Sequence, residues 1–191
     1  MGATTFTQED TRGRNDDGTI VTATYMGSGN NEDQSVNVDT PFRWRFVVQI
    51  GGMDAGDQNF QLWYSKNGGT YAQLTSTDGL SDGIRLINDA NSIVDDSVTV
   101  QDIGDGTYTS GTCDGYCDGT TDDDTGTVNI AVGEEGEAEF CFEFVSADVV
   151  NGNTFDLRVR RGTTVLNTYT NTPKVTVIKA AAARRIFITH V

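Results

Sequence analysis

Large apolar residues alternate with polar ones in several short stretches of the chain. Residues 42–48, Phe-Arg-Trp-Arg-Phe-Val-Val, place an aromatic side chain at alternate positions with arginines between, and residues 60–64 resume the same period. A period of two sends successive side chains to opposite faces of a strand, so each stretch is predicted to be a β-strand with one face in a core. A turn-forming run with Gly51, Gly52 and Gly56 joins the two strands, which are predicted to pair. The second strand ends at Asn67-Gly68-Gly69, whose glycines supply the positive φ of a hairpin turn.

The same alternation predicts most of the other strands. It is clearest in residues 137–145, where three phenylalanines share one face and Cys141 lies on the other as a small, half-buried thiol. Residues 5–18 are polar and end in a strong turn signal, and residues 89–94 could form a short helical turn. Further strands are expected at residues 19–26, 36–38, 98–102, 107–110, 155–160, 165–169 and 174–178, with short strands in long loops between 74 and 97.

These elements predict an all-β fold, an antiparallel β-sandwich of the jelly-roll or immunoglobulin-like kind. The chain has 191 residues, a length that such sandwiches reach as one domain. An apolar content of 36% and 22 glycines indicate many turns and solvent-facing strand faces, with few helices. We expect a sandwich domain at residues 1–179, followed at residues 180–191 by a β-rich arm or a final strand.

Charge is distributed unevenly along the chain. The net charge is −15, yet all 28 acidic residues lie at or before Asp156, so residues 1–156 carry −22 and residues 157–191 carry +7. This asymmetry suggests that the basic end meets an acidic partner, including another copy of the chain. The alternative is that basic strands sit beside acidic ones within one sandwich. Nucleic acid is not an expected partner, because most of the surface would repel phosphate.

The most unusual segment is the Gly-rich acidic loop at residues 113–126. Its carboxylates, among them Asp118, Asp122, Asp123 and Asp124, are weak candidates for a Ca²⁺ site, because Ca²⁺ prefers oxygen ligands. Their spacing fits no EF-hand loop, and a solvated loop tip is the favoured interpretation. Cys113 and Cys117 are a candidate disulfide, while a zinc site would lack ligands.

Motifs that carry catalysis are largely missing from the sequence. The single histidine is His190, and neither a phosphate-binding loop nor a dinucleotide fingerprint occurs. We therefore expect a protein that is not an enzyme and holds no cofactor, Ca²⁺ aside. No apolar stretch is long enough to span a membrane and the first residues do not read as a signal peptide, so synthesis in the cytoplasm is expected.

Several stretches carry a resemblance to a known group of proteins. They are Arg14-Asn15-Asp16-Asp17-Gly18 with Thr22-Ala23-Thr24, Phe42-Arg43-Trp44-Arg45-Phe46, Phe60-Gln61-Leu62-Trp63-Tyr64-Ser65-Lys66-Asn67-Gly68-Gly69, Glu139-Phe140-Cys141 and Leu157-Arg158-Val159. Together they resemble a family of β-sandwich structural proteins from tailed phages and environmental bacteria. The resemblance spans most of residues 5–178 and implies head decoration proteins, fibre or tail modules, or bacterial surface domains. It implies no catalytic residues.

The resemblance and the compact single domain favour a structural protein of the virion, a capsid decoration (cement) subunit. Its expected partners are copies of itself and a capsid or other virion protein, and it would be made in the host cytoplasm. One alternative is a carbohydrate-binding or receptor-binding module, in which Trp44, Trp63, Tyr64 and Tyr71 stack on glycans, although Trp44 and the other alternating aromatics are more simply core or sheet-face residues. Another is a subunit of an extracellular filament.

The C-terminal residues are the candidate assembly arm. Four alanines at 180–183 form a spacer before Arg184, Arg185, Ile186, Phe187 and Ile188, which combine positive charge with strong β character. Such a segment could pair with a sheet edge on a neighbouring subunit while its arginines meet an acidic surface. The competing interpretation is that it folds back as the last strand of its own sandwich.

Overall fold

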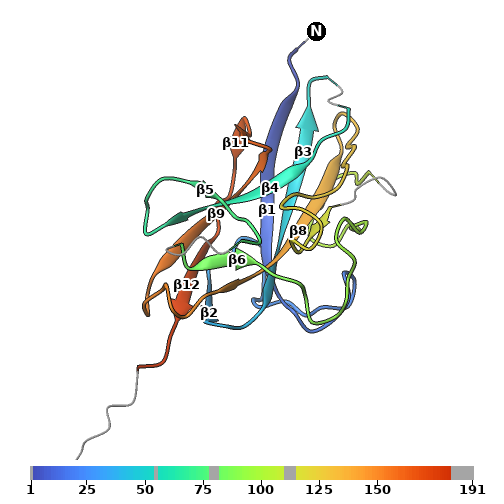
Figure 1. Ribbon diagram of the computed structural model, residues 1–191. Coiled ribbons are helices and arrows are strands. Elements are labelled where there is room, and N and C mark those ends of the chain that lie inside the picture. The colour runs from blue at the N-terminus through green and yellow to red at the C-terminus, as the bar shows by residue number, and fades with distance from the viewer. Residues whose placement is uncertain (1, 54–55, 78–81, 110–114, 182–191) are drawn as a thin grey trace, which may run out of the picture.

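The computed structural model describes residues 2–53, 56–77, 82–109 and 115–181 as two packed β-sheets (Figure 1). An all-β sandwich-like fold is therefore confirmed. In these residues the strands are β1 (Thr5–Asn15), β2 (Gln34–Asn37), β3 (Phe42–Gly51), β4 (Phe60–Lys66), β5 (Ala72–Gln73), β6 (Ile84–Leu86), β7 (Tyr116–Cys117), β8 (Glu135–Phe144), β9 (Thr154–Arg161), β10 (Thr164–Val165), β11 (Thr168–Tyr169) and β12 (Lys174–Ile178).

Strand order defines two mixed sheets. Sheet A runs β11-β1-β3-β8-β6, with β7 also on β8, and sheet B runs β2-β12-β9-β4-β5, with β10 also on β9. The pairs β1–β3, β3–β8, β4–β9 and β9–β12 are antiparallel, whereas β1–β11, β2–β12 and β7–β8 are parallel. The expectation of a purely antiparallel sandwich is thus wrong at the sheet edges and correct in their centres.

The core lies between the two sheets and is rich in aromatic rings. Sheet A contributes Phe42, Trp44 and the phenylalanines of β8, all at most 1% exposed. The rings of Phe144 in sheet A and Phe155 in sheet B contact each other across the interface, with centroids 4.7 Å apart. The expected placement of β8 at the centre of a sheet, with its phenylalanines in the core, is correct.

Strand β1 is the main element that the sequence pattern misplaces. Residues 5–15, expected to be an irregular polar segment, form a long strand, while residues 19–26, expected to be a strand, form turns with a single bridge at Tyr25. The inner face of β1 carries the buried polar residues Gln8 and Thr11, followed by Gly13. Gly13 is needed there because a Cβ would lie 3.0 Å from the Trp44 ring. A strand with so few apolar residues shows no hydrophobic period.

The two stretches expected to form a hairpin instead lie in opposite sheets. β3 pairs with β1 and β8, whereas β4 pairs with β5 and β9. Each strand turns its apolar side to the common core, so the two pack face to face rather than edge to edge. The turn after β4 does form as expected, with positive φ at Asn67 (53°) and Gly68 (73°), but it leads toward β5.

Other local expectations are corrected in the long loops. Residues 98–102 and 107–109 form no strand beyond a bridge between Tyr108 and Glu135, and residues 89–94 contain a turn rather than a helix. The Asp89 carboxylate holds this turn by accepting hydrogen bonds from the backbone N–H groups of Asn91 and Ile93. The hairpin expected after β9 forms with β10, but β11 crosses to pair with β1 in sheet A.

The chain after β12 is anchored at Lys179. Its ammonium group donates to the carbonyl oxygens of Ser146 and Val149, and its backbone N–H donates to Asn151. The assembly-arm residues 184–188 lie outside the described residues, so the arm and the final strand both stay predictions. Within the described part of the chain, no helix has the length and apolar character to cross a membrane.

Candidate interaction surface and buried charge cluster

The outward-facing side chains of sheet A form a buried charge cluster instead of a solvated face. Arg14 of β1, Arg43 and Arg45 of β3, and Glu137 and Glu139 of β8 alternate with the core residues and are at most 1% exposed. Their burial contradicts the expectation of a strand with a single buried face. Two loops, one of residues 16–32 and one of residues 87–109 together with 115–118, lie over this face (Figure 1) and exclude water from it.

Glu139 is the centre of the buried charge cluster. One carboxylate oxygen accepts from Arg14 at 2.7 Å and from Arg45 at 2.5 Å, and the other accepts from Arg43 at 3.1 Å. Burial by itself raises the pKa of Glu139, but the guanidiniums of Arg45, Arg14 and Arg43 outweigh burial and hold that pKa below its usual value. Glu139 is therefore ionised, and its negative charge is needed to neutralise the three buried guanidiniums.

The same guanidiniums fasten both covering loops to sheet A. Arg45 donates to the carbonyl oxygen of Ile20 in the first loop at 2.9 Å and to that of Val100 in the second at 3.1 Å. Arg14 and Arg43 add further bonds to the first loop, at the carbonyl oxygens of Gly18, Ile20 and Ala23. Because these are charge-assisted bonds in a dry environment, the cluster acts as a structural anchor.

Glu137 fixes the second loop through its backbone. One oxygen of its carboxylate accepts from the consecutive N–H groups of Asp102, Ile103 and Gly104, each at 2.9 Å, and the other accepts from Arg45 at 3.0 Å. Three convergent backbone donors form a small anion-binding concavity that Glu137 fills from within the same chain. The charged residues of sheet A thus bind its own loops.

The candidate Ca²⁺ ligands are spread over different partners. Asp118 is buried and caps the N–H of Thr120, Asp123 accepts from the N–H of Ser76, Asp124 accepts from Asn59, and Asp122 is exposed. Among the described residues no group of three His, Cys, Asp or Glu side chains is placed to hold a metal ion. The expected solvated loop tip agrees with the exposure of Asp122 but not with the burial of Asp118, which lies beside β7. Ca²⁺ binding stays a prediction.

Asp96 adds an acidic group that sequence reasoning did not single out. Burial raises its pKa to about 6, with Asp122, Asp95 and Asp124 contributing through their negative charge. Asp95 is itself occupied, because its two oxygens accept from the N–H groups of Asp118 and Thr121. The carboxylates in this part of the chain therefore repel one another while they organise the backbone.

The cysteines are buried where the structure describes them. Cys117 of β7 and Cys141 of β8 are unpaired thiols with no exposed surface. Burial raises the pKa of both thiols. Cys141 is fully rather than half buried, because the second covering loop lies over its face of the sheet. Cys113 lies outside the described residues, so the Cys113–Cys117 disulfide stays a prediction.

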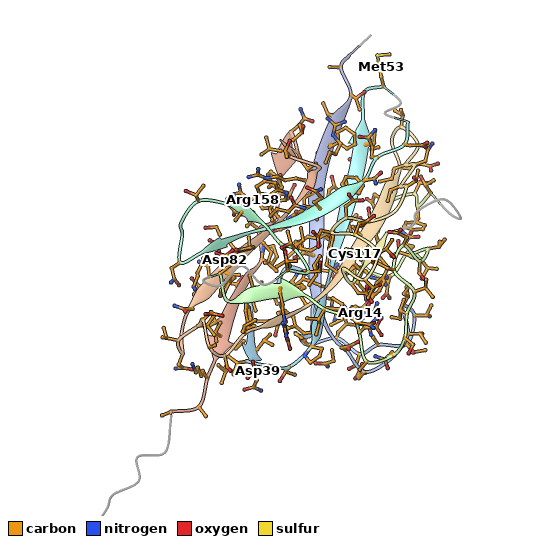
Figure 2. All side chains as sticks on the ribbon, viewed as in Figure 1. Arg14, Asp39, Met53, Asp82, Cys117 and Arg158 are labelled. Carbon is orange, nitrogen blue, oxygen red and sulfur yellow. The ribbon has the colours of Figure 1, made fainter. Side chains whose placement is uncertain are left out.

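The outer face of sheet B carries a row of arginines stacked on aromatic rings, here called the arginine–aromatic face. It consists of Trp63, Tyr71, Arg158 and Arg160 together with Tyr169 of the adjacent strand β11 of sheet A, all partly exposed. Arg158 lies between the rings of Tyr71 and Tyr169, 4.6 and 4.7 Å from their centroids, and Arg160 lies 4.0 Å from the Trp63 centroid. Figure 2 shows Arg158 on the strands of sheet B and Arg14 among the loops beside sheet A.

The expected glycan-stacking residues are divided between the core and this face. Trp44 and Tyr64 are 0% and 4% exposed, so they are core residues, as the simpler interpretation had it, and cannot stack on a sugar. Trp63 and Tyr71 do reach the arginine–aromatic face, where guanidiniums cover their ring surfaces. Sequence reasoning missed Arg158, Arg160 and Tyr169, although the alternation of arginine with apolar residues in β9 marks these arginines as outward-facing.

A pocket of about 270 Å³ lies beside β2, between Tyr25, Gln34 and Phe42. Its walls are mainly amide, hydroxyl and apolar groups, and its lining contains no carboxylate, lysine or arginine. Comparisons of the chain with protein-family models, with curated proteins and with solved structures find no match. The resemblance to phage β-sandwich proteins therefore stays a prediction.

Proposed function

We propose that the chain is a non-enzymatic structural protein of a phage particle, a decoration (cement) subunit bound to the capsid surface. One observation carries this proposal. The buried charged residues, Arg14, Arg43, Arg45, Glu137 and Glu139, bind one another and the covering loops instead of lining a cavity. Buried ion pairs and charge-assisted hydrogen bonds of this kind make the domain rigid and hold its long loops against the sheet.

The resemblance supplies the second support. The residues that carry it now have structural places: the arginines and aromatics of β3, the strand β4 with its turn, and Glu139 at the centre of the charge cluster. They are residues that build and seal a sandwich. A particle component needs a rigid, closed domain of this kind, because it is displayed in many copies and must survive outside the cell.

The test is to locate the protein on particles of the phage that encodes it. Antibodies raised against the purified chain, imaged by immunogold electron microscopy on purified particles, should label the head. Label confined to the tail or fibres would instead support a receptor-binding or tail module. Particles that carry no label, together with label on cellular filaments or on the cell surface, would overturn the proposal.

A biochemical version of the test uses stripped capsids. Purified protein should bind capsids lacking it in a saturable manner and raise the temperature at which those capsids release their genome. The E139Q variant, which disturbs the buried charge cluster, is a useful comparison if it still folds, because a weakened domain should protect the capsid at lower temperatures only. Absence of saturable binding to such capsids would contradict a cement role.

A further inference from the structure

The arginine–aromatic face is prepared to receive negative charge. Arg158 is held between two tyrosine rings and by a bond from its Nε to the Thr172 hydroxyl, and Arg160 is held on Trp63. Stacking fixes the planes of both guanidiniums, so little side-chain entropy remains to be lost when they bind a carboxylate. A face with two fixed cations is unusual in a chain whose net charge is −15.

The chemistry of this face favours a carboxylate-bearing protein over a sugar or a nucleic acid. A sugar ring stacks on a free aromatic surface, but guanidiniums already cover the rings of Trp63, Tyr71 and Tyr169. A nucleic acid would meet repulsion from the rest of the acidic molecule. What the face offers outward is the guanidinium edge, which pairs with carboxylates.

The chain itself contains a matching acidic surface. Glu9 and Asp10 lie in the β1 bulge between Gln8 and Thr11, beside Val47 of β3, and Gly104, the residue before Asp105, lies against Val47 and against Glu135 of β8. We call the exposed or partly exposed Glu9, Asp10 and Asp105, with the buried Glu135 beside them, the acidic patch. Burial raises the pKa of Glu9, and the negative charges of Asp10 and Asp105 raise it further. Burial likewise raises the pKa of Glu135, with Glu9, Asp105 and Asp10 contributing. An incoming cation would relieve this repulsion.

We propose that the arginine–aromatic face of one copy binds the acidic patch of a second copy. The surrounding charge agrees with this occupant, since residues 87–134, which contribute Asp105, contain eleven acidic residues and no Lys or Arg. The two surfaces are different, so the contact is heterologous, and repeating it generates a ring or an open chain of subunits. The inference is independent of the proposed place on a phage particle.

The experiment is sedimentation velocity on the full chain over a wide concentration range at low and high salt. The wild-type protein should self-associate with concentration, and association should weaken as salt rises, because surface charges are screened beyond about 10 Å at 0.1 M ionic strength. The R158E/R160E variant should lose at least about tenfold in association constant. If charge reversal unfolds the protein by circular dichroism, R158Q/R160Q replaces it. A wild-type chain that stays monomeric throughout would overturn the proposal.

A matched control separates this face from the arginine pair near the end of the sequence. R184E/R185E changes the net charge by the same amount and should leave self-association unchanged. Loss of association in this control, alone or together with R158E/R160E, would overturn the proposal, because the arm or the total charge would then be responsible.

Complementation identifies the second surface. The E9K/D105K variant should also fail to self-associate, since its acidic patch is reversed. For mixing, the neutral variants R158Q/R160Q and E9Q/D105N are used, because two charge-reversed surfaces would attract each other. This mixture should form one-to-one dimers and nothing larger, because each variant keeps one intact surface and only one charged contact is possible. Normal self-association of E9K/D105K, or a mixture that stays monomeric or grows beyond dimers, would contradict the assignment of the acidic patch.

Discussion

The outer faces of the two sheets carry the same alternating pattern of arginines, but the arginines are buried in one sheet and partly exposed in the other. In sheet A, Arg43 and Arg45 alternate with core aromatics and are completely buried against Glu139. In sheet B, Arg158 and Arg160 alternate with core aliphatic residues and stay partly exposed on aromatic rings. The difference lies outside the strands, in two long loops that cover one face only. The alternation along a strand therefore predicts which residues face the core. Whether the residues on the other face are buried or exposed to solvent depends on segments distant in the sequence.

The largest loss of stability should come from removing the Glu139 carboxylate from the outer face of sheet A, which the two loops cover. In E139Q the guanidiniums of Arg14, Arg43 and Arg45 stay buried without their shared carboxylate, and breaking a buried ion pair in this way costs about 3–5 kcal/mol. Urea denaturation of the variant measures this loss. A loss under about 1 kcal/mol would mean that water reaches the cluster and that the two faces differ less than described.

A smaller effect is expected where a single loop is released. The E137A variant leaves the N–H groups of residues 102–104 without their acceptor, and an unsatisfied buried donor costs about 1–3 kcal/mol. It also removes one carboxylate from Arg45, which keeps Glu139 as its partner and is therefore not left as an unpaired charge. Hydrogen exchange should accelerate at residues 102–104 and at Val100, with little change in β9 or β12. Uniform acceleration over both sheets would contradict the role of Glu137 as a local anchor.

The covering loops should also give the protein a pH dependence. Because burial and neighbouring acids raise the pKa of Asp96 to about 6 from an ordinary 3.8, the folded state binds its proton more tightly than the unfolded state does. The free energy of unfolding therefore falls as pH rises from about 4 to about 6, because Asp96 loses its proton more readily in the unfolded state. Above about pH 6 the contribution of Asp96 no longer changes with pH. Since Asp96 is partly exposed, we expect an effect of at most about 1 kcal/mol.

Urea midpoints of the wild-type chain and D96N at pH 5 and pH 7 test this expectation. The wild type should lose more stability than D96N between the two values, and D96N should be the more stable protein at pH 7. Added Ca²⁺ sharpens the result: if the neighbouring acids bind it, the ion should stabilise the wild type more at pH 7 than at pH 5. Equal slopes for both proteins would exclude Asp96 as the cause.

The smallest loss of stability is expected at the arginine–aromatic face of sheet B. In R158Q the contacts with Tyr71 and Tyr169 are lost, and exposed cation–π contacts are worth about 0.5–1 kcal/mol. The same substitution at Arg43 should cost several times more, because its partner Glu139 is fully buried. Equal losses for R43Q and R158Q, measured by urea denaturation, would remove the distinction between the two faces.

Sequence reasoning succeeds where one strand face is strongly apolar. β8 and β9 follow from their alternation, and the all-β class follows from many such stretches between turns. It fails at β1, whose inner face holds Gln8, Thr11 and Gly13, because polar and small residues give no hydrophobic period. The pairing of β3 with β4 was wrong because alternation fixes a strand's face and not its neighbours.

Candidate sites were harder to predict because they depend on contacts distant in sequence. Arg43 meets Glu139 across 96 residues, and this partnership leaves no local signal. Trp63 and Tyr71 were listed together with the buried Trp44 and Tyr64 as possible glycan-stacking residues, and their guanidinium partners come from β9, far along the chain. The acidic patch likewise combines β1, β8 and a loop, so only the fold brings its carboxylates together.

The position of β12 has a consequence for how the molecule is made. This strand, Lys174–Ile178, lies inside sheet B between β2 and β9, and among the residues that the structure describes β12 is the one ladder partner of β2. On the ribosome, Gln34–Asn37 must wait for residues 174–178 to emerge before it can join a sheet. Because such distant pairings form late, the nascent chain should remain bound to chaperones until β12 is released, and then fold in one cooperative step.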